Sequence, residues 1–378
     1  MGKRELVLIS VFVLLGIGVY QFTAPPPAPG SQGVSLSGIF QSMKREVQGA
    51  RESATAESQQ TVACDPSVGE LRINIPRNSD ITVTGEDRPD VSAEFHVTAR
   101  GFDQAEAKVV AQATTLKAER VGDALVVSLD TSAARSLPRN NGTSQMVLQL
   151  KVPRRLALRM EPHTGRLVVE NLASAEIMGS RGETRLKTFA GRVVLTHSGG
   201  ALEIEDLPAL KLNSRNSNGT VKQVRGAMTV DAIGGDLTLT DLIGPLEVEA
   251  RNTDLRLDGL EGLKVPLRIN LTGGDLHVEG LRSEARIDGR NTNMEIALAA
   301  AAPVTIYNLG AIRVTAPPDG YTLDAGATEG HISIEDGGIR PTEGADPRAT
   351  GSVRGGGPRL TVRATRGSIT LVKPSGGK

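Results

Sequence analysis

The sequence predicts an all-β protein, a parallel β-solenoid built from coils of about 18 residues. Four segments that begin at Thr164, Gly199, Gly234 and Gly273 can be laid over one another, with starts 35, 35 and 39 residues apart. Within each segment, short runs of alternating apolar and polar residues lie between Gly, Asn and Asp, the pattern of strands joined by turns. A unit this thin cannot bury its own apolar face, so neighbouring units must stack.

The composition agrees with narrow, stacked aliphatic coils. The chain has six Phe, three Tyr and no Trp, although 39% of it is hydrophobic. Lys plus Arg and Asp plus Glu both number 43, so no net charge attracts nucleic acid, and stacking platforms for single strands are lacking. A single cysteine, Cys64, excludes an intrachain disulfide and leaves a free or intermolecularly paired thiol.

The N-terminus predicts a membrane segment. Residues 1–5 form a cytoplasmic tip in which Lys3 and Arg4 precede an apolar run, and residues 6–22 are expected to be a transmembrane anchor or a signal. Positive charge on the short side keeps that end in the cytoplasm, so the bulk of the chain is expected to be exported to the periplasmic or extracellular face. Residues 23–60 read as a Pro/Gly-rich and polar linker, partly helical from Ile39 to Gln60.

Residues 61–160 are expected to form an N-terminal β cap with one helix. The segment from Asp103 to Arg120 has apolar residues at helical spacing and no Gly or Pro, which predicts a helix. Such a cap would cover the open strand edge of the first coil. Alternating residues predict its strands at 70–76, 81–84, 92–98, 124–129 and 146–152.

Residues 161–378 contain the repeats. Gly235-Asp236-Leu237, Thr253-Asp254-Leu255 and Gly274-Asp275-Leu276 are equivalent points, and Gly310-Ala311-Ile312 and Gly330-His331-Ile332 continue the series with weaker sequence. A sandwich of hairpins is the competing architecture, but it would not place Gly-Asp-Leu at one phase. The pattern leaves open whether a coil is the single repeat unit or a double unit of twice that length. The loop from Gly337 to Pro358 interrupts the last coils.

The order of these segments resembles a known family. The runs LRINIP from Leu71 and ITVTGED from Ile81 come first, VPRRLALRMEPHTGRLVVENL from Val152 follows, and the iterated G-x-L-x-L-x-D-L pattern completes the series. Over residues 62–375 the chain resembles the bacterial putative-adhesin family of repetitive β-solenoid domains, whose function is otherwise unknown. The resemblance implies surface adhesion and carries over no catalytic residue.

No enzymatic motif accompanies the repeats. The chain has no HExxH, no GxSxG elbow and no P-loop, and its five histidines (His96, His163, His197, His277 and His331) are not at metal-ligand spacing. The recurring Asp236, Asp254, Asp275 and Asn293 match either a carboxylate row or stacked turn residues, of which we expect the turn role. We therefore expect no catalytic, cofactor-binding or metal-binding residues and no cofactor.

A second recurring set carries positive charge. Arg181, Arg215, Arg251 and Arg290 share one phase, about 10 Å apart if each coil is a single repeat unit. One hypothesis is a binding stripe for an anionic glycan or a cell-envelope polymer. The alternative is that these arginines cap turn carbonyls or pair with neighbouring acids.

The function expected from these features is that of a non-enzymatic, membrane-anchored, exported β-solenoid, an adhesin or a cell-envelope scaffold and binding module. Its expected partners are the membrane, through the N-terminal helix, and an envelope glycan or surface protein, but not nucleic acid. The alternatives are a carbohydrate-active β-helix enzyme, such as a polysaccharide lyase or glycosidase, and an envelope scaffold that self-assembles through solenoid edges. The oligomeric state is left open.

Overall fold

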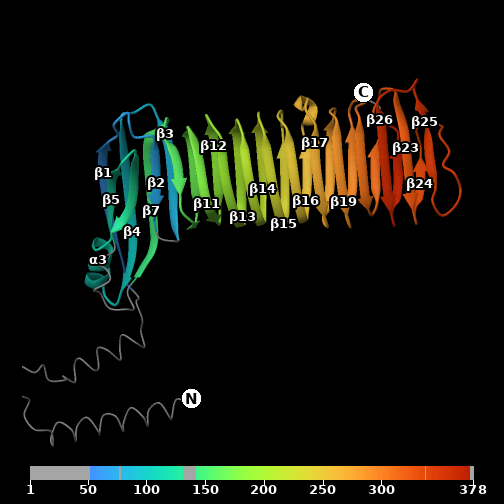
Figure 1. Ribbon diagram of the computed structural model, residues 1–378. Helices are drawn as coiled ribbons and strands as arrows, with labels where there is room; N and C mark the ends of the chain where they lie inside the picture. Colours follow the sequence, from blue (N-terminus) through green and yellow to red (C-terminus); the bar gives the residue numbers. More distant parts are fainter. Residues whose placement is uncertain (1–51, 76–77, 131–141, 337, 375–378) are drawn as a thin grey trace, which may run out of the picture. The chain divides into compact units, whose positions relative to one another are not determined.

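The computed structural model describes residues 52–75, 78–130, 142–336 and 338–374. These residues are mostly β, with one short α-helix, and they join into a long, largely parallel sheet that is consistent with a solenoid (Figure 1). Within the same residues, no helix is both long and apolar enough to cross a membrane. The expected anchor at 6–22 and the linker at 23–51 lie outside the described residues.

The first part of the described chain contains strands β1 to β9 and the helix. Their bounds are β1 (Glu52–Ala63), β2 (Glu70–Asn74), β3 (Ser79–Glu86), β4 (Asp90–Gly101), α3 (Gln104–Gln112), β5 (Thr115–Val121), β6 (Ala124–Asp130), β7 (Gly142–Pro153), β8 (Ala157–Met160) and β9 (His163–Thr164). Strands β2, β3, β4, β6 and β7 confirm the five strands expected in this region.

The repeats and the C-terminal part contain the remaining elements. The repeats hold β10 (Leu167–Leu172), β11 (Ser174–Arg181), β12 (Thr184–Phe189), β13 (Val193–Leu207), β14 (Leu210–Val224), β15 (Met228–Thr240), β16 (Leu246–Asp258), the 3-10 turn η2 (Leu260–Gly262), β17 (Leu267–Thr272), β18 (Asp275–Leu281), β19 (Ala285–Arg290), β20 (Asn293–Leu298), β21 (Val304–Leu309) and β22 (Ile312–Thr315). The C-terminal part holds β23 (Tyr321–Thr328), β24 (His331–Ile334), β25 (Arg348–Val353), β26 (Arg359–Thr365) and β27 (Ser368–Val372).

Parallel pairing repeats at a nearly constant interval along the chain. Val193 pairs with Leu210, Leu210 with Met228, and Met228 with Leu246. The long strands β13 to β16 pair again after a corner, where Leu237 lies beside Leu255. Each turn of the chain therefore contributes one strand to each of two sides.

The core consists of aliphatic side chains that stack in register. Leu212, Val230, Val248, Ile269 and Ile287 are successive partners on one side, and each is almost fully buried. Burying one such side chain stabilises the fold by about 1.5–3 kcal/mol. A column of this kind has room for branched aliphatic groups in every coil, which explains the shortage of aromatics.

The expected helix from Asp103 to Arg120 is correct only in its first half. Asp103 caps α3 by accepting a hydrogen bond of 2.8 Å from the Glu106 amide. Thr115–Val121, expected to be helical up to Arg120, is strand β5, which pairs antiparallel with β6. Gly122, with φ of 67°, makes the tight turn between the two strands, and this pairing outweighs the helical pattern.

Residues 52–60, expected to belong to a partly helical linker, lie in β1. This strand pairs antiparallel with β4 along its whole length, from Glu52 beside Gly101 to Ala63 beside Asp90. The next residue, Cys64, is a free thiol that is buried. The folded unit therefore begins before the cap boundary that the sequence suggested.

At both ends of the stack, the strands do not follow chain order. Strand β2 lies between β6 and β8, and β3 lies between β7 and β10, so an early coil is enclosed by two later ones. At the other end, β26 lies between β21 and β23, and β27 lies between β22 and β24. Figure 1 shows β26 beside β23 at this end. We name these two enclosed coils, β2–β3 and β26–β27, the inserted coils.

The expectation that Gly310-Ala311-Ile312 and Gly330-His331-Ile332 belong to successive coils is wrong, because the C-terminal inserted coil lies between them. Ile312 and Ile332 do occupy one phase, since both pair with Ile369, but they are not direct neighbours. The loop from Gly337 to Pro358 includes β25, which pairs antiparallel with β23 and lies beyond it.

A buried polar network holds this last cap. The Tyr321 hydroxyl donates to Asp336 Oδ2 at 3.0 Å, and Arg354 Nη1 donates to Asp336 Oδ1 at 2.9 Å. Burial and the hydrogen bond to Asp336 raise the pKa of Tyr321, so the hydroxyl remains a donor.

Candidate functional site

From Asn216 to Asn291, the corner between the two sides of successive coils alternates Asn and Gly. Asn216, Gly234, Asn252, Gly273 and Asn291 follow one another along the stack, and all have left-handed φ, from 49° to 71°. A Cβ on Gly234 would lie 2.5 Å from Asn216 Oδ1, and one on Gly273 would lie 2.6 Å from Asn252 Oδ1. The side chains of Asn216 and Asn252 thus occupy the space beside a Gly of the following coil. The chemical repeat at this corner is therefore twice as long as the pairing step of a single coil.

Buried hydroxyls fix the backbone beside this corner. They belong to the residue after each Asn and donate to the carbonyl two residues earlier. The pairs are Ser217 to Arg215 at 3.0 Å, Thr253 to Arg251 at 3.0 Å and Thr292 to Arg290 at 3.3 Å. In the alternate coils the same place is taken by Gly235 and Gly274, whose added Cβ would lie 2.3 Å from the backbone oxygen below.

The predicted arginines lie along one edge of this corner. Arg215 pairs with Ile233, Ile233 with Arg251, Arg251 with Thr272, and Thr272 with Arg290. One arginine therefore recurs every two coils, about 10 Å apart. We name Arg181, Arg215, Arg251 and Arg290 the arginine column.

Arg181 extends the column by two further coils. Arg181 follows Ser180 at the end of β11, and Ser180 pairs with His197. Ser198, which follows His197, pairs with Arg215, so Arg181 and Arg215 share one register position. All four arginines are exposed. The structure thus brings together the four residues that the sequence phase selected.

Three members of the arginine column have free guanidinium groups among the described residues. Arg251 Nη2 lies 3.0 Å from Glu249 Oε1, but both side chains are well exposed, at 62% and 60%. An exposed pair of this kind contributes about 0–1 kcal/mol. Arg181, Arg215 and Arg290 form no ion pair and no side-chain hydrogen bond within the described part of the chain.

The other edge of the corner carries acids and amides. We name Asn218, Asp236, Asp254, Asp275 and Asn293 the acidic column. The Asp236 amide donates to Asn218 Oδ1 at 3.1 Å and the Asp275 amide to Asp254 Oδ1 at 2.9 Å, while Asn293 Nδ2 donates to Asp275 Oδ1 at 2.9 Å. These side chains link one coil to the next.

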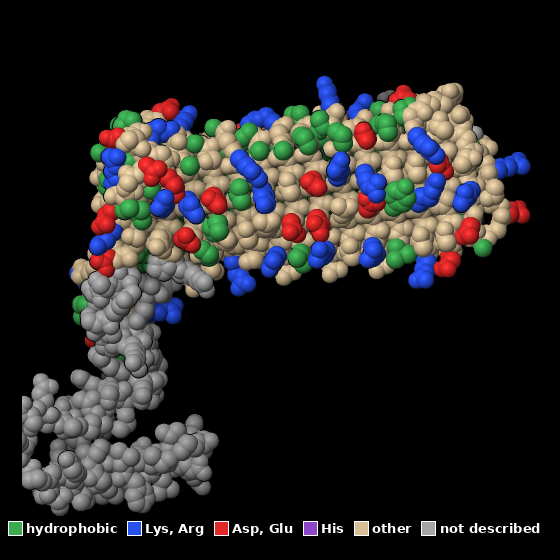
Figure 2. All heavy atoms as spheres, viewed as in Figure 1, with side chains coloured by type: hydrophobic (Ala, Val, Ile, Leu, Met, Phe, Trp, Pro, Cys, Tyr) green, Lys and Arg blue, Asp and Glu red, His purple; other side chains and the backbone are tan. Residues whose placement is uncertain are grey.

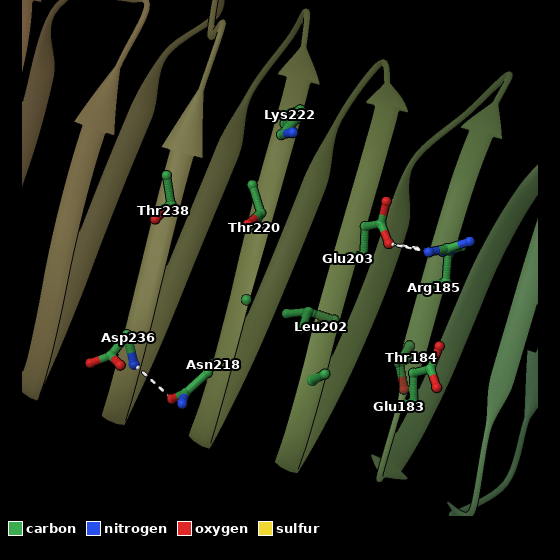
Figure 3. A pocket seen from close by; sticks show the side chains of 12 residues that line it. Glu183, Thr184, Arg185, Leu202, Glu203, Asn218, Thr220, Lys222, Asp236 and Thr238 are labelled. Carbon is green, nitrogen blue, oxygen red and sulfur yellow. Dashed lines mark hydrogen bonds and ion pairs between the residues drawn. The ribbon is translucent and has the colours of Figure 1, made fainter.

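A shallow groove of about 500 Å³ begins at the acidic column. Figure 3 shows Thr220, Lys222 and Thr238 on neighbouring strands of this groove, with Asn218 and Asp236 at one end. An ion pair of 2.6 Å between Arg185 and Glu203 lies at the other end. Hydroxyl, ammonium and amide groups suit a polar ligand, and the lining has no aromatic ring for stacking on a sugar.

The charges on the visible long face are mixed. Figure 2 shows Lys and Arg side chains interspersed with Asp and Glu over the repeats, with hydrophobic side chains between them. A binding site on this face must therefore use the placement of individual charges.

Two of the five histidines are buried inside the N-terminal coils. His197 Nδ1 lies 2.8 Å from Ser217 Oγ, and its Nε2 lies 3.2 Å from the Gly182 carbonyl. Burial lowers the pKa of both His163 and His197, because the charged imidazolium loses its hydration. Burial therefore favours the neutral form of both rings, in which only one ring nitrogen carries a proton.

His277 has a different environment, which the sequence analysis missed. Its Nε2 lies 3.7 Å from Glu279 Oε2, and its Nδ1 lies 3.4 Å from Glu295 Oε2. One coil earlier, Asp258 completes a group of three side chains whose ligand atoms lie within 4.8 Å of one another. The equivalence of Asp254 and Asp275 already places Asp258 opposite Glu279, and this signal in the sequence could have found the pair.

The fold and this surface define a class: a protein of stacked, largely parallel β coils with polar columns outside. No protein-family model matches the sequence, and no curated protein matches it. Solved structures that are similar include a putative adhesin from Parabacteroides distasonis ATCC 8503, at 11% identity over 84% of this chain and 97% of that one, with a TM-score of 0.32. Another is a putative adhesin from Parabacteroides merdae ATCC 43184, at 12% identity over 84% and 96%, with a TM-score of 0.30.

A third similar structure has a different description. It is a putative lipid binding protein from Parabacteroides distasonis ATCC 8503, at 12% identity over 86% of this chain and 98% of that one, with a TM-score of 0.31. The structural neighbours thus include putative adhesins, the family that the sequence resembles. At these identities and TM-scores, no activity or ligand follows from the likeness.

Proposed function

We propose that this chain is a non-enzymatic, exported β-solenoid whose coil is the single repeat unit, held at a membrane by its N-terminal segment. It acts as an adhesin or cell-envelope binding module whose arginine column binds an anionic glycan or envelope polymer. The observation that carries the proposal is the regular spacing of exposed guanidinium groups, of which three are free among the described residues.

The physical basis is a fixed spacing of cations. Strand register and the buried hydroxyls of Ser217, Thr253 and Thr292 set the backbone positions of Arg215, Arg251 and Arg290. A surface that is already ordered loses less entropy when it binds. Guanidinium groups bind carboxylate or phosphate in bidentate geometry, so a polymer with regularly spaced anions fits a column of this kind.

The acidic column supports a binding role over catalysis. Asp254 and Asp275 accept hydrogen bonds from the following coil, which gives these carboxylates a structural task. The carbohydrate-active enzyme remains the alternative. It predicts that the full chain releases new reducing or unsaturated ends from envelope glycans, and that Asp254→Asn abolishes the release while the fold is kept.

One observation favours the self-assembling scaffold as a second candidate. The 12-residue strand β1 pairs with β4 along one edge, and no described strand pairs with its other edge. An open edge can accept a strand from another chain. Concentration-dependent filaments of the full chain would support this candidate, and a monomer at all concentrations would exclude it.

The test of the main proposal is a binding measurement with the full chain. The ligands are peptidoglycan and a panel of anionic and neutral glycans, and the variant replaces Arg181, Arg215, Arg251 and Arg290 by Gln. We expect binding to anionic polymers to weaken at least tenfold. A matched control replaces the exposed Arg192, Lys211, Lys264 and Arg282 by Gln, which removes the same charge elsewhere. If both variants lost binding equally, the effect would be due to net charge alone. If the first variant lost no binding, the arginine column would not be the binding site.

Anchoring and export have a separate test. The chain should sediment with membranes, and protease added outside should degrade the part after residue 22. Truncation of residues 1–22 should release it. A chain that stays protected or soluble throughout would contradict the anchor.

A further inference from the structure

Asp258 at the end of β16 forms a cluster with His277 and Glu279 in β18, away from the arginine column. Leu257 in β16 pairs with Val278 in β18, so Asp258 and Glu279 directly follow a paired position and lie side by side. His277 stands two residues before Glu279 on the same outward face. The three ligand atoms lie within 4.8 Å of one another.

The cluster has more negative charge than its own cations balance. Arg256 Nε lies 2.6 Å from Asp258 Oδ2, and Arg256 Nη2 lies 3.4 Å from Glu279 Oε2. Glu295, beside His277, has only Arg313 at 3.8 Å among the described cations. Three carboxylates thus face two guanidinium groups.

One oxygen of the cluster is unsatisfied. Asp258 Oδ1 is buried and has no hydrogen-bond partner among the described residues, whereas Oδ2 is bound by Arg256. A buried polar atom without a partner destabilises the fold, and more so when it is charged. A cation that bound this oxygen would remove this destabilisation.

The regular repeat is interrupted at the same place. The step along the chain from Leu246 to its partner Leu267 is longer than the steps on either side, from Met228 to Leu246 and from Leu267 to Ala285. The extra residues form η2, which begins just after Asp258. Glu261 of this turn reaches Gly280, the residue after Glu279, where an added Cβ would lie 3.1 Å from Glu261 Oε1.

We infer that Asp258, His277 and Glu279 bind a divalent transition-metal ion of the zinc type. One imidazole and two carboxylates are a donor set that Zn²⁺ accepts, at about 2.0–2.2 Å from each atom. The side chains must move together from their present separation, which exposed Glu279 allows. Three protein ligands leave a fourth position for water or for an anionic group of a partner. His277 also lines a hollow of about 320 Å³.

The experiment is a titration of the full chain with Zn²⁺ alone, followed by calorimetry, and with Co²⁺, followed by its visible absorption. The variants are His277→Gln and Asp258→Asn. The matched controls are His331→Gln, an exposed histidine on β24, and Asp254→Asn, an exposed acid earlier in β16. Thermal unfolding with and without Zn²⁺ gives a second readout, because an ion that binds only the folded chain raises the melting temperature.

We expect one ion per chain, at least tenfold weaker binding in His277→Gln and Asp258→Asn, and unchanged binding in both controls. The rise in melting temperature should disappear in the same two variants. Absence of binding by the unaltered chain, or equal binding by His277→Gln, would overturn the inference. Neither result bears on the arginine column, whose residues are untouched.

Discussion

The two edges of the corner carry opposite charges. They also differ in how many contacts their side chains make with neighbouring coils. Side chains of the acidic column reach the neighbouring coil, as when Asp254 Oδ1 accepts the Asp275 amide. In the arginine column, Arg251 has one exposed ion pair and the other three guanidinium groups have none among the described residues. At one corner, therefore, one row of side chains links neighbouring coils, and the other row makes few contacts with the described residues.

The largest effect is expected from breaking the corner itself. Gly235→Ala should destabilise the protein by about 2–4 kcal/mol, because φ there is 87° and the added Cβ would lie 2.3 Å from the backbone carbonyl oxygen of Ser217. Thermal and urea unfolding measure this. Gly199→Asn is the control, since Asn216 occupies the equivalent corner of the next coil and nothing lies within 4 Å of a Cβ at Gly199. An equal loss in both variants would contradict the role of the close contact.

The next effect is the pH dependence of stability that comes from the buried histidines His163 and His197. The folded-state pKa values of His163 and His197 are lowered, so below the ordinary value of 6.5 the unfolded chain binds protons that the folded chain does not. Stability should therefore be full above that pH and should fall as the pH drops below it. Melting temperatures from pH 8 to pH 5 measure the loss, and His163→Leu should reduce it. A flat profile in the unaltered chain would contradict the burial argument.

A smaller effect should separate the two columns directly. Asp254→Ala removes the acceptor of the Asp275 amide and should cost about 1 kcal/mol. Arg251→Ala removes an exposed pair and should change stability by less than about 0.5 kcal/mol. Asp254→Asn keeps an oxygen acceptor and serves as the control in urea unfolding. If Arg251→Ala cost more than Asp254→Ala, the division between the columns would be wrong.

Added salt is expected to have the smallest effect on the stability of the fold. Its effect on polymer binding is expected to be strong. Exposed charges are screened over about 10 Å at 0.1 M ionic strength. Binding of an anionic polymer by the arginine column should weaken steadily with added NaCl, while the melting temperature stays nearly constant. Binding that is insensitive to salt would indicate a surface other than the column.

The sequence phase was sufficient to find the arginine column, because each pairing step preserves the phase from Arg215 to Arg290. The sequence left open whether a coil is one or two repeat units. The reason is that Asn and Gly alternate at the corner, so the residue pattern repeats only every second coil. The phase that aligns Asp254 with Asp275 also places Asp258 opposite Glu279, but it does not show how closely their side chains approach His277. Thr115–Val121 was mistaken for helix because its partner strand, and not its own pattern, decides its conformation.

The inserted coils have a consequence for how the chain is made. Synthesis delivers residues from the N-terminus onward, yet β26 and β27 must enter between strands that emerge before them. The C-terminal end of the stack cannot close until the last coil has left the ribosome. A chain truncated before Arg359 leaves β21 and β22 without their outer neighbours, so this end of the stack closes only after β26 and β27 have been made.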